Sequence, residues 1–285
     1  MPTVTVGIFG EKKKGKIMTD LLLPEFIKKN LSTEFVGREI IYFEETGSTN
    51  DEAKSAAARG AADGTLVLAE RQSGGKGRLD RKFFCPKGGL WFSIILRPPF
   101  LPTDAPKCTL LAAVAVNEAL QKFGFAPRIK WPNDIYLSGK KLAGILTEMN
   151  AVTGKINFVV VGIGLNANID AEDFSPELLS LATSLSIEKG SSVDRAKILV
   201  EILTSLEKLY KTAIRDGFDG IFDRWRKYSL TLGQNVQVIG IGERENFFGK
   251  AIDIDFDGAL LIETDDGERR RVLAGDVSLR PRTDF

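Results

Sequence analysis

The chain has 285 residues, of which 43% are hydrophobic, and this is enough for one large domain and a small one. Its 39 lysines and arginines balance 38 aspartates and glutamates, so a net charge of +1 provides no global field for gripping nucleic acid or an anionic membrane. The apolar runs have the length of strands and fall short of the roughly 20 residues that span a bilayer. We therefore expect neither a membrane anchor nor a signal peptide.

Histidine is absent from the chain, which excludes catalytic triads with a histidine base and histidine-ligated zinc. The two cysteines, Cys85 and Cys108, have the spacing of neither a disulfide framework nor a metal site, as is typical of a cytoplasmic protein. Any catalysis must therefore rest on positioning and charge. Formation of an acyl-adenylate suits that restriction, because a carboxylate is already a nucleophile.

The first 37 residues differ from the rest and are too short for an independent core. Within them, Gly10–Lys16 has the spacing of a phosphate-binding P-loop, but Ile17 stands where that motif needs a hydroxyl for magnesium. We interpret this segment as a solvated basic turn.

The sequence pattern changes again after Gly233, where short β-rich runs replace the mixture of strands and helices. We therefore predict an extension over residues 1–37, a large domain over 38–231 and a small domain over 232–285.

The large domain is predicted to combine strands and helices. A strand over 40–43 leads into a helix that begins at Ser48–Asn50, where Thr49 and Glu52 have the form of a capping box, and that ends at Gly60. Strands over 65–69 and 90–96 enclose a glycine-rich basic loop. The remaining elements are a helix over 109–123, a short strand ending at Trp131, two hairpins that turn at Ser138-Gly139 and Thr153-Gly154, and helices over 193–215 and 221–228.

The small domain contains five short β-rich runs separated by glycine and aspartate turns, over 236–241, 247–254, 259–263, 270–274 and 277–280. This pattern predicts a small barrel of roughly fifty residues. The fold class is therefore α+β, with a mixed β-sheet flanked by helices and a small C-terminal β-barrel.

The glycine-rich loop runs from Gln72 to Lys82 and is the first candidate site. Its glycines let the backbone approach a ligand closely, and its cations can bind phosphate and carboxylate oxygens: Lys76, Arg78, Arg81 and Lys82. Taken alone, such a loop is more often a mobile surface segment.

A second candidate site follows the short strand that ends at Trp131. Asp134 can hold a magnesium ion, and Lys141, across the turn on the next strand, can reach an anionic substrate. The alternative is a plain strand end with a solvated lysine. Gly144 favours a site, because a glycine inside a strand often marks the close approach of a ligand. Further along, Gly162–Asn166 ends a very apolar strand, where the Asn166 amide can contact a flat base, although a turn explains this segment equally well.

Together and in this order, these motifs resemble the biotin protein ligase family, over a match from about Phe43 to Arg280. The resemblance implies the class II synthetase-like biotin/lipoate ligase fold with an SH3-like C-terminal domain. It also implies ATP-dependent formation of biotinyl-5'-AMP, followed by transfer of biotin to a lysine of a biotin carboxyl carrier protein. Residues 38–231 would then be the catalytic domain.

The resemblance also implies a role for each matching position. The biotin-binding residues would be Ser48, Thr49, Asn50, Gln72, Lys76, Gly77, Arg78, Lys141 and Gly144. The ATP-binding residues would be Lys76, Arg78, Lys130, Asn133 and Asn166. Lys141, Arg78 and Lys76 would act in catalysis, and Asp134 would bind the Mg2+ that accompanies ATP.

Three positions depart from the family's usual loop, with Lys76 where arginine is common, Asp80 where glycine is common and Phe83 where tryptophan is common. A lysine cannot bind a phosphate in the bidentate manner of arginine. We therefore expect a Lys76→Arg variant to retain or gain adenylation activity.

Many members of the family carry an N-terminal winged-helix repressor domain, for which residues 1–37 are too short. We therefore expect a cytoplasmic ligase that binds no DNA and no membrane, whose partner is the biotin carboxyl carrier domain of a carboxylase. The apolar run Phe158–Val161 is a candidate edge for a homodimer. Two alternatives remain, a lipoate-type ligase with the same adenylate chemistry and a non-catalytic module that binds biotin or the carrier.

Overall fold

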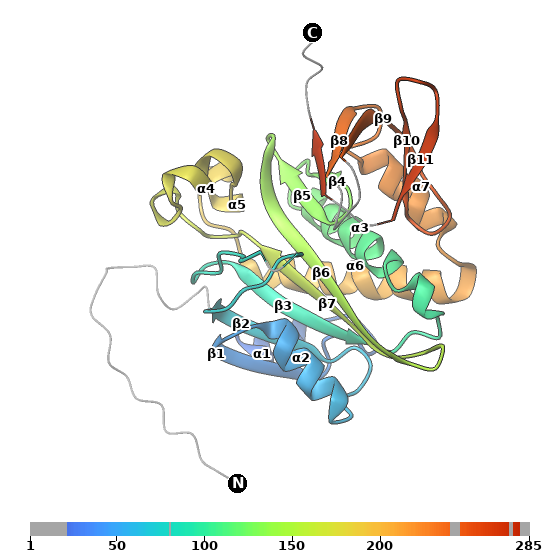
Figure 1. Ribbon diagram of the computed structural model, residues 1–285. Coiled ribbons are helices and arrows are strands. Elements are labelled where there is room, and N and C mark those ends of the chain that lie inside the picture. The colour runs from blue at the N-terminus through green and yellow to red at the C-terminus, as the bar shows by residue number, and fades with distance from the viewer. Residues whose placement is uncertain (1–21, 80, 240–245, 274–275, 280–285) are drawn as a thin grey trace.

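The computed structural model describes residues 22–79, 81–239, 246–273 and 276–279. Seven strands form its main layer: β1 (Ile40–Thr46), β2 (Leu66–Gln72), β3 (Leu90–Leu96), β4 (Arg128–Lys130), β5 (Asp134–Leu137), β6 (Lys140–Val152) and β7 (Lys155–Leu165). Their order is β1-β2-β3-β7-β6-β5-β4 (Figure 1). β1 and β2 are parallel and the other neighbours are antiparallel, so the predicted mixed sheet is confirmed.

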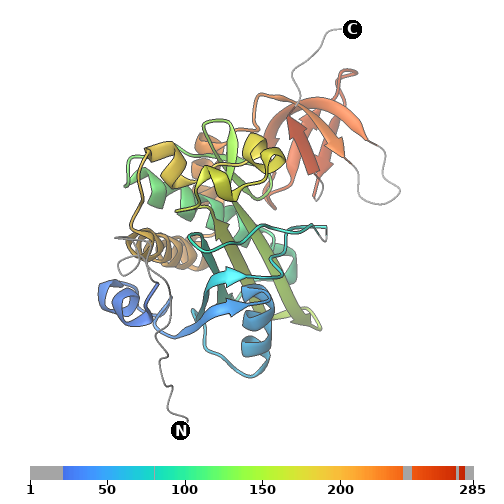
Figure 2. The ribbon, with the colours of Figure 1, turned by 90° about the vertical axis from the view of Figure 1, so that its left-hand side faces the viewer.

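Helices cover both faces of this sheet (Figures 1 and 2). α2 (Thr49–Ala58) packs on one face, against β2, β3 and β7. α3 (Lys107–Gln121) and α6 (Arg195–Asp216) cover the other face, with α1 (Pro24–Asn30) against α6 and α7 (Asp219–Tyr228) against α3. The predicted helices over 109–123, 193–215 and 221–228 are therefore confirmed to within a few residues.

Side chains along β3 alternate between the two faces, because successive residues of a strand point in opposite directions. Leu90, Phe92 and Ile94 enter the large core beneath α3 and α6, whereas Ile95 packs against α2. Ser93, on the α2 face, has no exposed surface. A polar side chain thus lies at the centre of an apolar strand and needs partners on that face.

The segment before β1 belongs to the same core as the sheet. Leu22, Ile27 and Val36 are fully buried in it. The backbone N–H groups of residues 34–36 donate to the carboxylate of Glu207 on α6, at distances from 2.8 to 3.1 Å. The boundary expected at residue 38 stays a prediction, and the basic turn Gly10–Lys16 lies outside the described residues.

The C-terminal part is a five-stranded antiparallel sheet in the order β11-β10-β9-β8-β12. Its strands lie where the sequence predicts them, at Asn235–Ile239 (β8), Phe247–Ile254 (β9), Leu260–Glu263 (β10), Arg269–Val272 (β11) and Asp276–Leu279 (β12). Trp131 Nε1 donates to the Gly258 carbonyl at 3.1 Å, which joins the turn after β9 to the segment that precedes β5.

Two local predictions are wrong. The first is the capping box of Thr49 and Glu52, since the N-cap residue of α2 is Ser48. The box does not form because the Thr49 N–H donates to Gln72 Oε1 and the Glu52 carboxylate accepts from the Thr46 hydroxyl. The run Phe158–Val161 is not an edge, because it lies in β7 between β3 and β6.

The chain between β7 and α6 holds elements that the sequence analysis did not assign, namely a 3-10 turn (Ala171–Asp173), α4 (Pro176–Leu181) and α5 (Leu185–Lys189). Ser175 and Ser184 accept the N–H groups of Leu178 and Ile187, and so cap these two short helices. No helix among the described residues is long and apolar enough to cross a membrane.

Candidate active site

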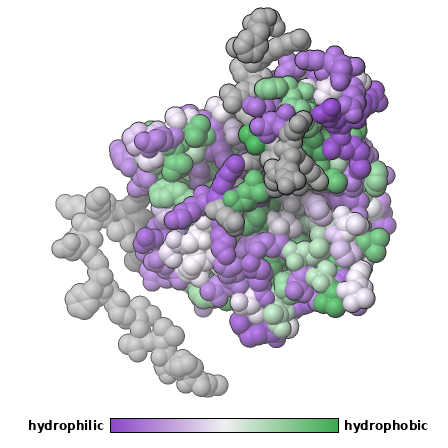
Figure 3. All heavy atoms as spheres, in the orientation of Figure 1, coloured by the Kyte–Doolittle hydropathy of each residue, from purple (hydrophilic) through white to green (hydrophobic). Residues whose placement is uncertain are grey.

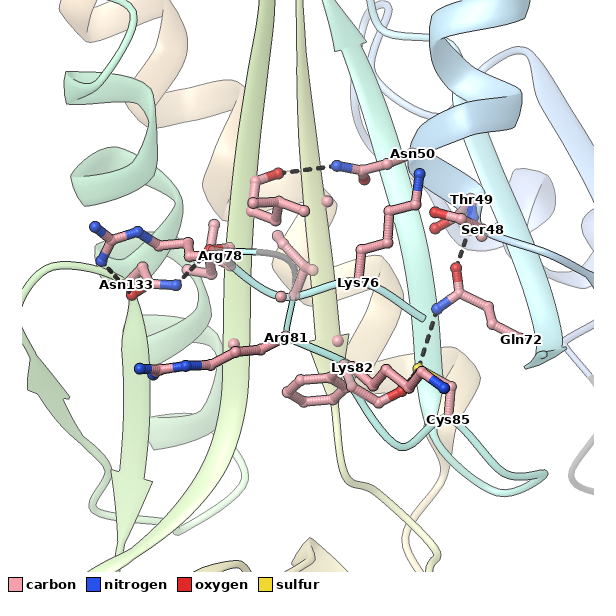
Figure 4. A pocket seen from close by; sticks show the side chains of 18 of the residues that line it. Ser48, Thr49, Asn50, Gln72, Lys76, Arg78, Arg81, Lys82, Cys85 and Asn133 are labelled. Atoms are coloured by element: carbon pink, nitrogen blue, oxygen red, sulfur yellow. Dashed lines mark hydrogen bonds between the residues drawn. The ribbon is translucent and has the colours of Figure 1, made fainter. Parts of the chain in front are cut away.

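A pocket opens on the α2 face of the sheet, beneath the glycine-rich loop (Figure 4). It brings together eleven of the thirteen predicted site residues: Ser48, Thr49, Asn50, Gln72, Lys76, Gly77, Arg78, Asn133, Asp134, Lys141 and Gly144. They come from α2, the end of β2, the loop, and the hairpin of β5 and β6. Hydrophilic side chains cover much of this side of the molecule (Figure 3).

Three glycines form the floor of the pocket. Gly144 on β6 and Gly164 on β7 are register partners, and a Cβ added at either would lie 3.1 Å from the ring of Phe83. A Cβ on Gly162 would lie 1.9 Å from Asn50 Oδ1. Because these positions lack side chains, Phe83 and Asn50 lie directly on the sheet. Phe83 also meets Trp91 edge to face, with 6.0 Å between the ring centroids.

One end of the pocket is polar and held by hydrogen bonds. Gln72 Oε1 accepts from the Thr49 N–H at 2.6 Å, and Gln72 Nε2 donates to Cys85 Sγ at 3.1 Å. Ser48 precedes the first turn of α2, yet its side chain caps no backbone N–H. Its hydroxyl is therefore not committed to the helix and faces a pocket at a helix N-terminus, where partial positive charge favours electronegative ligand atoms.

Asn50 is the best-held side chain of this end and is only 4% exposed. Its Nδ2 donates to Glu148 Oε2 at 2.8 Å and to the Leu146 carbonyl at 3.2 Å, while its Oδ1 accepts from Ser93 at 2.6 Å. Both amide protons are thus used within the protein. Only the oxygen retains capacity for a ligand.

The cation of Lys76 is paired with α2. Its Nζ lies 2.6 Å from Asp51 Oδ2, and Lys54 lies between Asp51 and Glu148, at 2.9 and 2.6 Å. Burial works to raise the pKa of Asp51, but the hydrogen bonds from the two lysines outweigh it and leave that pKa lowered. The loop is therefore tied to α2 by charge. Asp80 lies outside the described residues.

The opposite side of the pocket carries Lys141 and Arg78. Lys141 Nζ lies 2.7 Å from Asp134 Oδ1 and 5.5 Å from the centre of the Phe83 ring. Arg78 donates to Asn133 Oδ1 at 3.3 Å, and Asn133 donates in turn to the Ile145 carbonyl at 2.8 Å (Figure 4). Two cations thus face the pocket where an anion can be neutralised.

Two predicted residues do not line the pocket. The amide of Asn166 is buried and donates to the Thr183 carbonyl at 2.9 Å. Lys130 lies 5.3 Å from the centre of the Tyr136 ring. Their contact with ATP stays a prediction.

Sequence reasoning missed the residues behind the motifs, chiefly Ser93, Glu148 and Lys54. Ser93 is a polar residue within the apolar strand β3, and that is the signal that could have identified it, because a buried polar group must find a partner. No such signal marks Glu148, which lies in a half-exposed and largely polar part of β6. Their partner, Asn50, lies 43 and 98 residues away in the sequence. The contact therefore becomes visible only in the folded chain.

Two family models match the chain. The model of the biotin/lipoate A/B protein ligase family matches residues 42–166, and that of the biotin protein ligase C terminal domain matches residues 231–280.

Individual relatives agree with these matches. The bifunctional ligase/repressor BirA of Bacillus subtilis (strain 168) is 40% identical over 270 residues, which cover 94% of this chain and 81% of the relative. The biotin--[acetyl-CoA-carboxylase] ligase of Mycobacterium tuberculosis is 32% identical over 270 residues, which cover 90% of this chain and 97% of that protein. The structure of a biotin protein ligase from Aquifex aeolicus in complex with biotin and ATP superposes with a TM-score of 0.74 at 30% identity, over 85% of this chain and 99% of that one.

The sheet and its helices are thus those of the biotin/lipoate protein ligase class. Within that class, the chain belongs to the biotin protein ligase family.

Proposed function

We propose that the pocket binds biotin with its ureido ring at the polar end and its carboxylate among the cations. Family membership makes the chain an enzyme, an ATP-dependent biotin–protein ligase. The observation that supports the proposal is the juxtaposition in one pocket of Thr49 and Gln72 on one side and Arg78 and Lys141 on the other. A ligand with a hydrogen-bonding ring at one end and a carboxylate at the other fits that polarity.

The chemistry follows from this placement. An oxygen of the biotin carboxylate attacks the α-phosphorus of ATP, a new O–P bond forms, and the bond to pyrophosphate breaks. Negative charge accumulates at the phosphorus, where Lys141, Arg78 and Lys76 can meet it. In the second step the amine of a protein lysine attacks the acyl carbon and AMP leaves, so the enzyme itself needs no nucleophile.

Lys76, Lys141 and Arg78 each have a partner within the protein before substrate arrives. Their partners are Asp51, Asp134 and Asn133. An incoming anion therefore exchanges one partner for another. The cation's position is set in advance, which lowers the cost of ordering it in the transition state.

Mg2+ enters the proposal as the ion that accompanies ATP, with Asp134 as its ligand. Asp134 is the only carboxylate among the described residues that line the pocket, and no group of three histidine, cysteine, aspartate or glutamate residues gathers in the described part of the chain. This donor set fits Mg2+, which proteins usually hold with one or two carboxylates plus substrate phosphates. When bound, the ion would neutralise phosphate charge.

The acceptor of biotin is proposed to be the carrier domain of a carboxylase, and the cytoplasm the site of action. That the chain binds no DNA also stays a prediction, supported by its net charge of +1. Salt-dependent binding to duplex DNA by the isolated chain would overturn it.

The test is biotin-dependent exchange of labelled pyrophosphate into ATP, with lipoate as the competing acid. Exchange with biotin that falls at least about a hundredfold in Lys141→Ala is the expected result, because a charge-assisted contact in the transition state contributes about 3 kcal/mol. Lys211→Ala is the matched control, since that lysine pairs with Glu34 far from the pocket. Exchange with lipoate instead of biotin would favour the lipoate-ligase alternative, and no exchange with either acid would favour a binding module.

A further inference from the structure

The described part of the glycine-rich loop is folded back on itself as a narrow hairpin. The Gly77 N–H donates to the Arg81 carbonyl at 2.7 Å, and the Phe83 N–H donates to the Gly75 carbonyl at 2.9 Å. These bonds stiffen the loop along its length, but they join the loop only to itself. Its place over the pocket therefore depends on the contacts that its side chains make with other elements.

Two side chains attach the loop to opposite sides of the pocket. Arg78 Nη1 donates to Asn133 Oδ1 at 3.3 Å, directly before β5. Lys76 Nζ lies 2.6 Å from Asp51 Oδ2 on α2. In Figure 4, Arg78 lies beside Asn133, whereas Lys76 lies on the side of Asn50. The loop thus crosses the pocket from α2 to the segment before β5.

The attachment to α2 belongs to a row of alternating charges. Lys54 Nζ lies 2.9 Å from Asp51 Oδ1 and 2.6 Å from Glu148 Oε1 on β6. The second lysine fixes one oxygen of Asp51, so the other oxygen is left for Lys76. Among the described residues, Lys76 lines the pocket and neither Asp51 nor Lys54 does. Asp51 can therefore influence the pocket only through a neighbour.

Lys76 can keep this pairing while it serves the substrate. An ammonium group has three N–H donors, and the contact with Asp51 uses one, so two remain for oxygens of a phosphate. The carboxylate has opposite effects on the lysine. It fixes the position of the ammonium group, but it also offsets part of the positive charge that a phosphate would meet.

We infer that Asp51 is a positioning residue that, through Lys76, holds the loop over the acyl-adenylate and slows the loss of this intermediate before the acceptor lysine arrives. The inference rests on the proposed function and deepens it. Adenylation draws on the charge of Lys76, whereas retention of the intermediate draws on its position. The loss to be prevented is release of the intermediate or its hydrolysis, in which water adds to the acyl carbon, the bond to the phosphate oxygen breaks, and biotin and AMP leave.

The test measures how fast the enzyme loses the adenylate when no acceptor is present. The enzyme is loaded with biotin, ATP labelled at the α-phosphate and pyrophosphatase, freed of unbound nucleotide and followed by its bound label. Asp51→Asn should lose label about two- to fivefold faster than the wild type, a small factor because both partners are half-exposed. Pyrophosphate exchange should stay equal or rise up to about twofold, because the charge of Lys76 is no longer offset. Slower exchange would indicate a damaged site and overturn the inference.

A double-mutant cycle separates the pairing from an effect on the helix. Asp51 lies in the first turn of α2, where a carboxylate also stabilises the helix N-terminus. That effect would persist in a Lys76→Ala background, whereas the pairing effect would vanish. Asp51→Asn should therefore change the rate of loss there by less than about 1.5-fold.

Two single variants complete the test. Asp51→Glu keeps the charge and should retain the adenylate better than Asp51→Asn. Asp216→Asn is the matched control, because it removes the carboxylate of an exposed pair with Arg215 at the end of α6, and both rates should stay unchanged. An unchanged rate of loss in Asp51→Asn, or an equal acceleration in the Lys76→Ala background, would overturn the inference. A wild-type enzyme that forms no adenylate from biotin would instead refute the proposed function.

Discussion

Gly162 offers the sharpest test of how the pocket is built. In Gly162→Ala, the new Cβ would lie 1.9 Å from Asn50 Oδ1 and 2.8 Å from Asn50 Cγ, which is closer than atoms can approach. The backbone at this point is held between β3 and β6, with Ser93 and Leu146 as register partners of Gly162. The strand cannot move away, so the Asn50 side chain must rotate out of place.

The cost follows from the bonds that Asn50 would lose. These are a charge-assisted hydrogen bond to Glu148 and two neutral ones, with Leu146 and Ser93. At about 1.5–3 kcal/mol for the first and about 1 kcal/mol for each of the others, the gross loss is about 4 kcal/mol. Water entering from the open pocket recovers part of it, so we expect urea denaturation to show a loss of about 2–4 kcal/mol in the free energy of unfolding.

Two controls isolate the clash. Gly220→Ala, in α7 with nothing within 4 Å of the added Cβ, should be neutral or stabilise by up to about 1 kcal/mol. In an Asn50→Ala background the obstructing amide is gone, so Gly162→Ala should cost less than about 1 kcal/mol. An equal cost in both backgrounds would refute the steric reasoning.

Three other regions give further predictions. Burial works to raise the pKa of Glu207, but hydrogen bonds from three backbone N–H groups leave it lowered, so its stabilisation is complete above the ordinary pKa of 4.5 and is lost as the pH falls through the folded value. Acid titration of the unfolding free energy should therefore be shallower in Glu207→Gln than in the wild type, and parallel curves would contradict this. Glu70→Ala leaves Arg195 buried without its carboxylate and should cost about 3–5 kcal/mol in urea denaturation, whereas a loss below about 1 kcal/mol would contradict the buried pair. Burial raises the pKa of Cys85 and of Cys108 to about 12, so a thiol reagent at pH 8 should modify the native enzyme far more slowly than the unfolded chain, and equal rates would contradict the burial.

Most elements of the fold could be predicted because their signals are local. The run of β3 is apolar except for Ser93 and has the length of a strand, and each of the hairpin turns at Ser138-Gly139 and Thr153-Gly154 supplies a glycine for a position of positive φ. The start of α2 was predicted less well. Its capping pattern is also local, but Gln72 and Thr46 compete for the same groups, and they come close only when β1 and β2 pair.

The site residues also divide into those with a local sequence signal and those whose orientation depends on distant partners. Glycines and cations at motif spacing identified the loop and the hairpin of β5 and β6, and the pocket brings them together. Asn166 shows the limit of motif reasoning, because its amide is directed into the protein, toward Thr183 in a segment for which the sequence pattern gave no element. Which way a polar side chain points depends on the partner that reaches it, and that partner can come from anywhere in the chain.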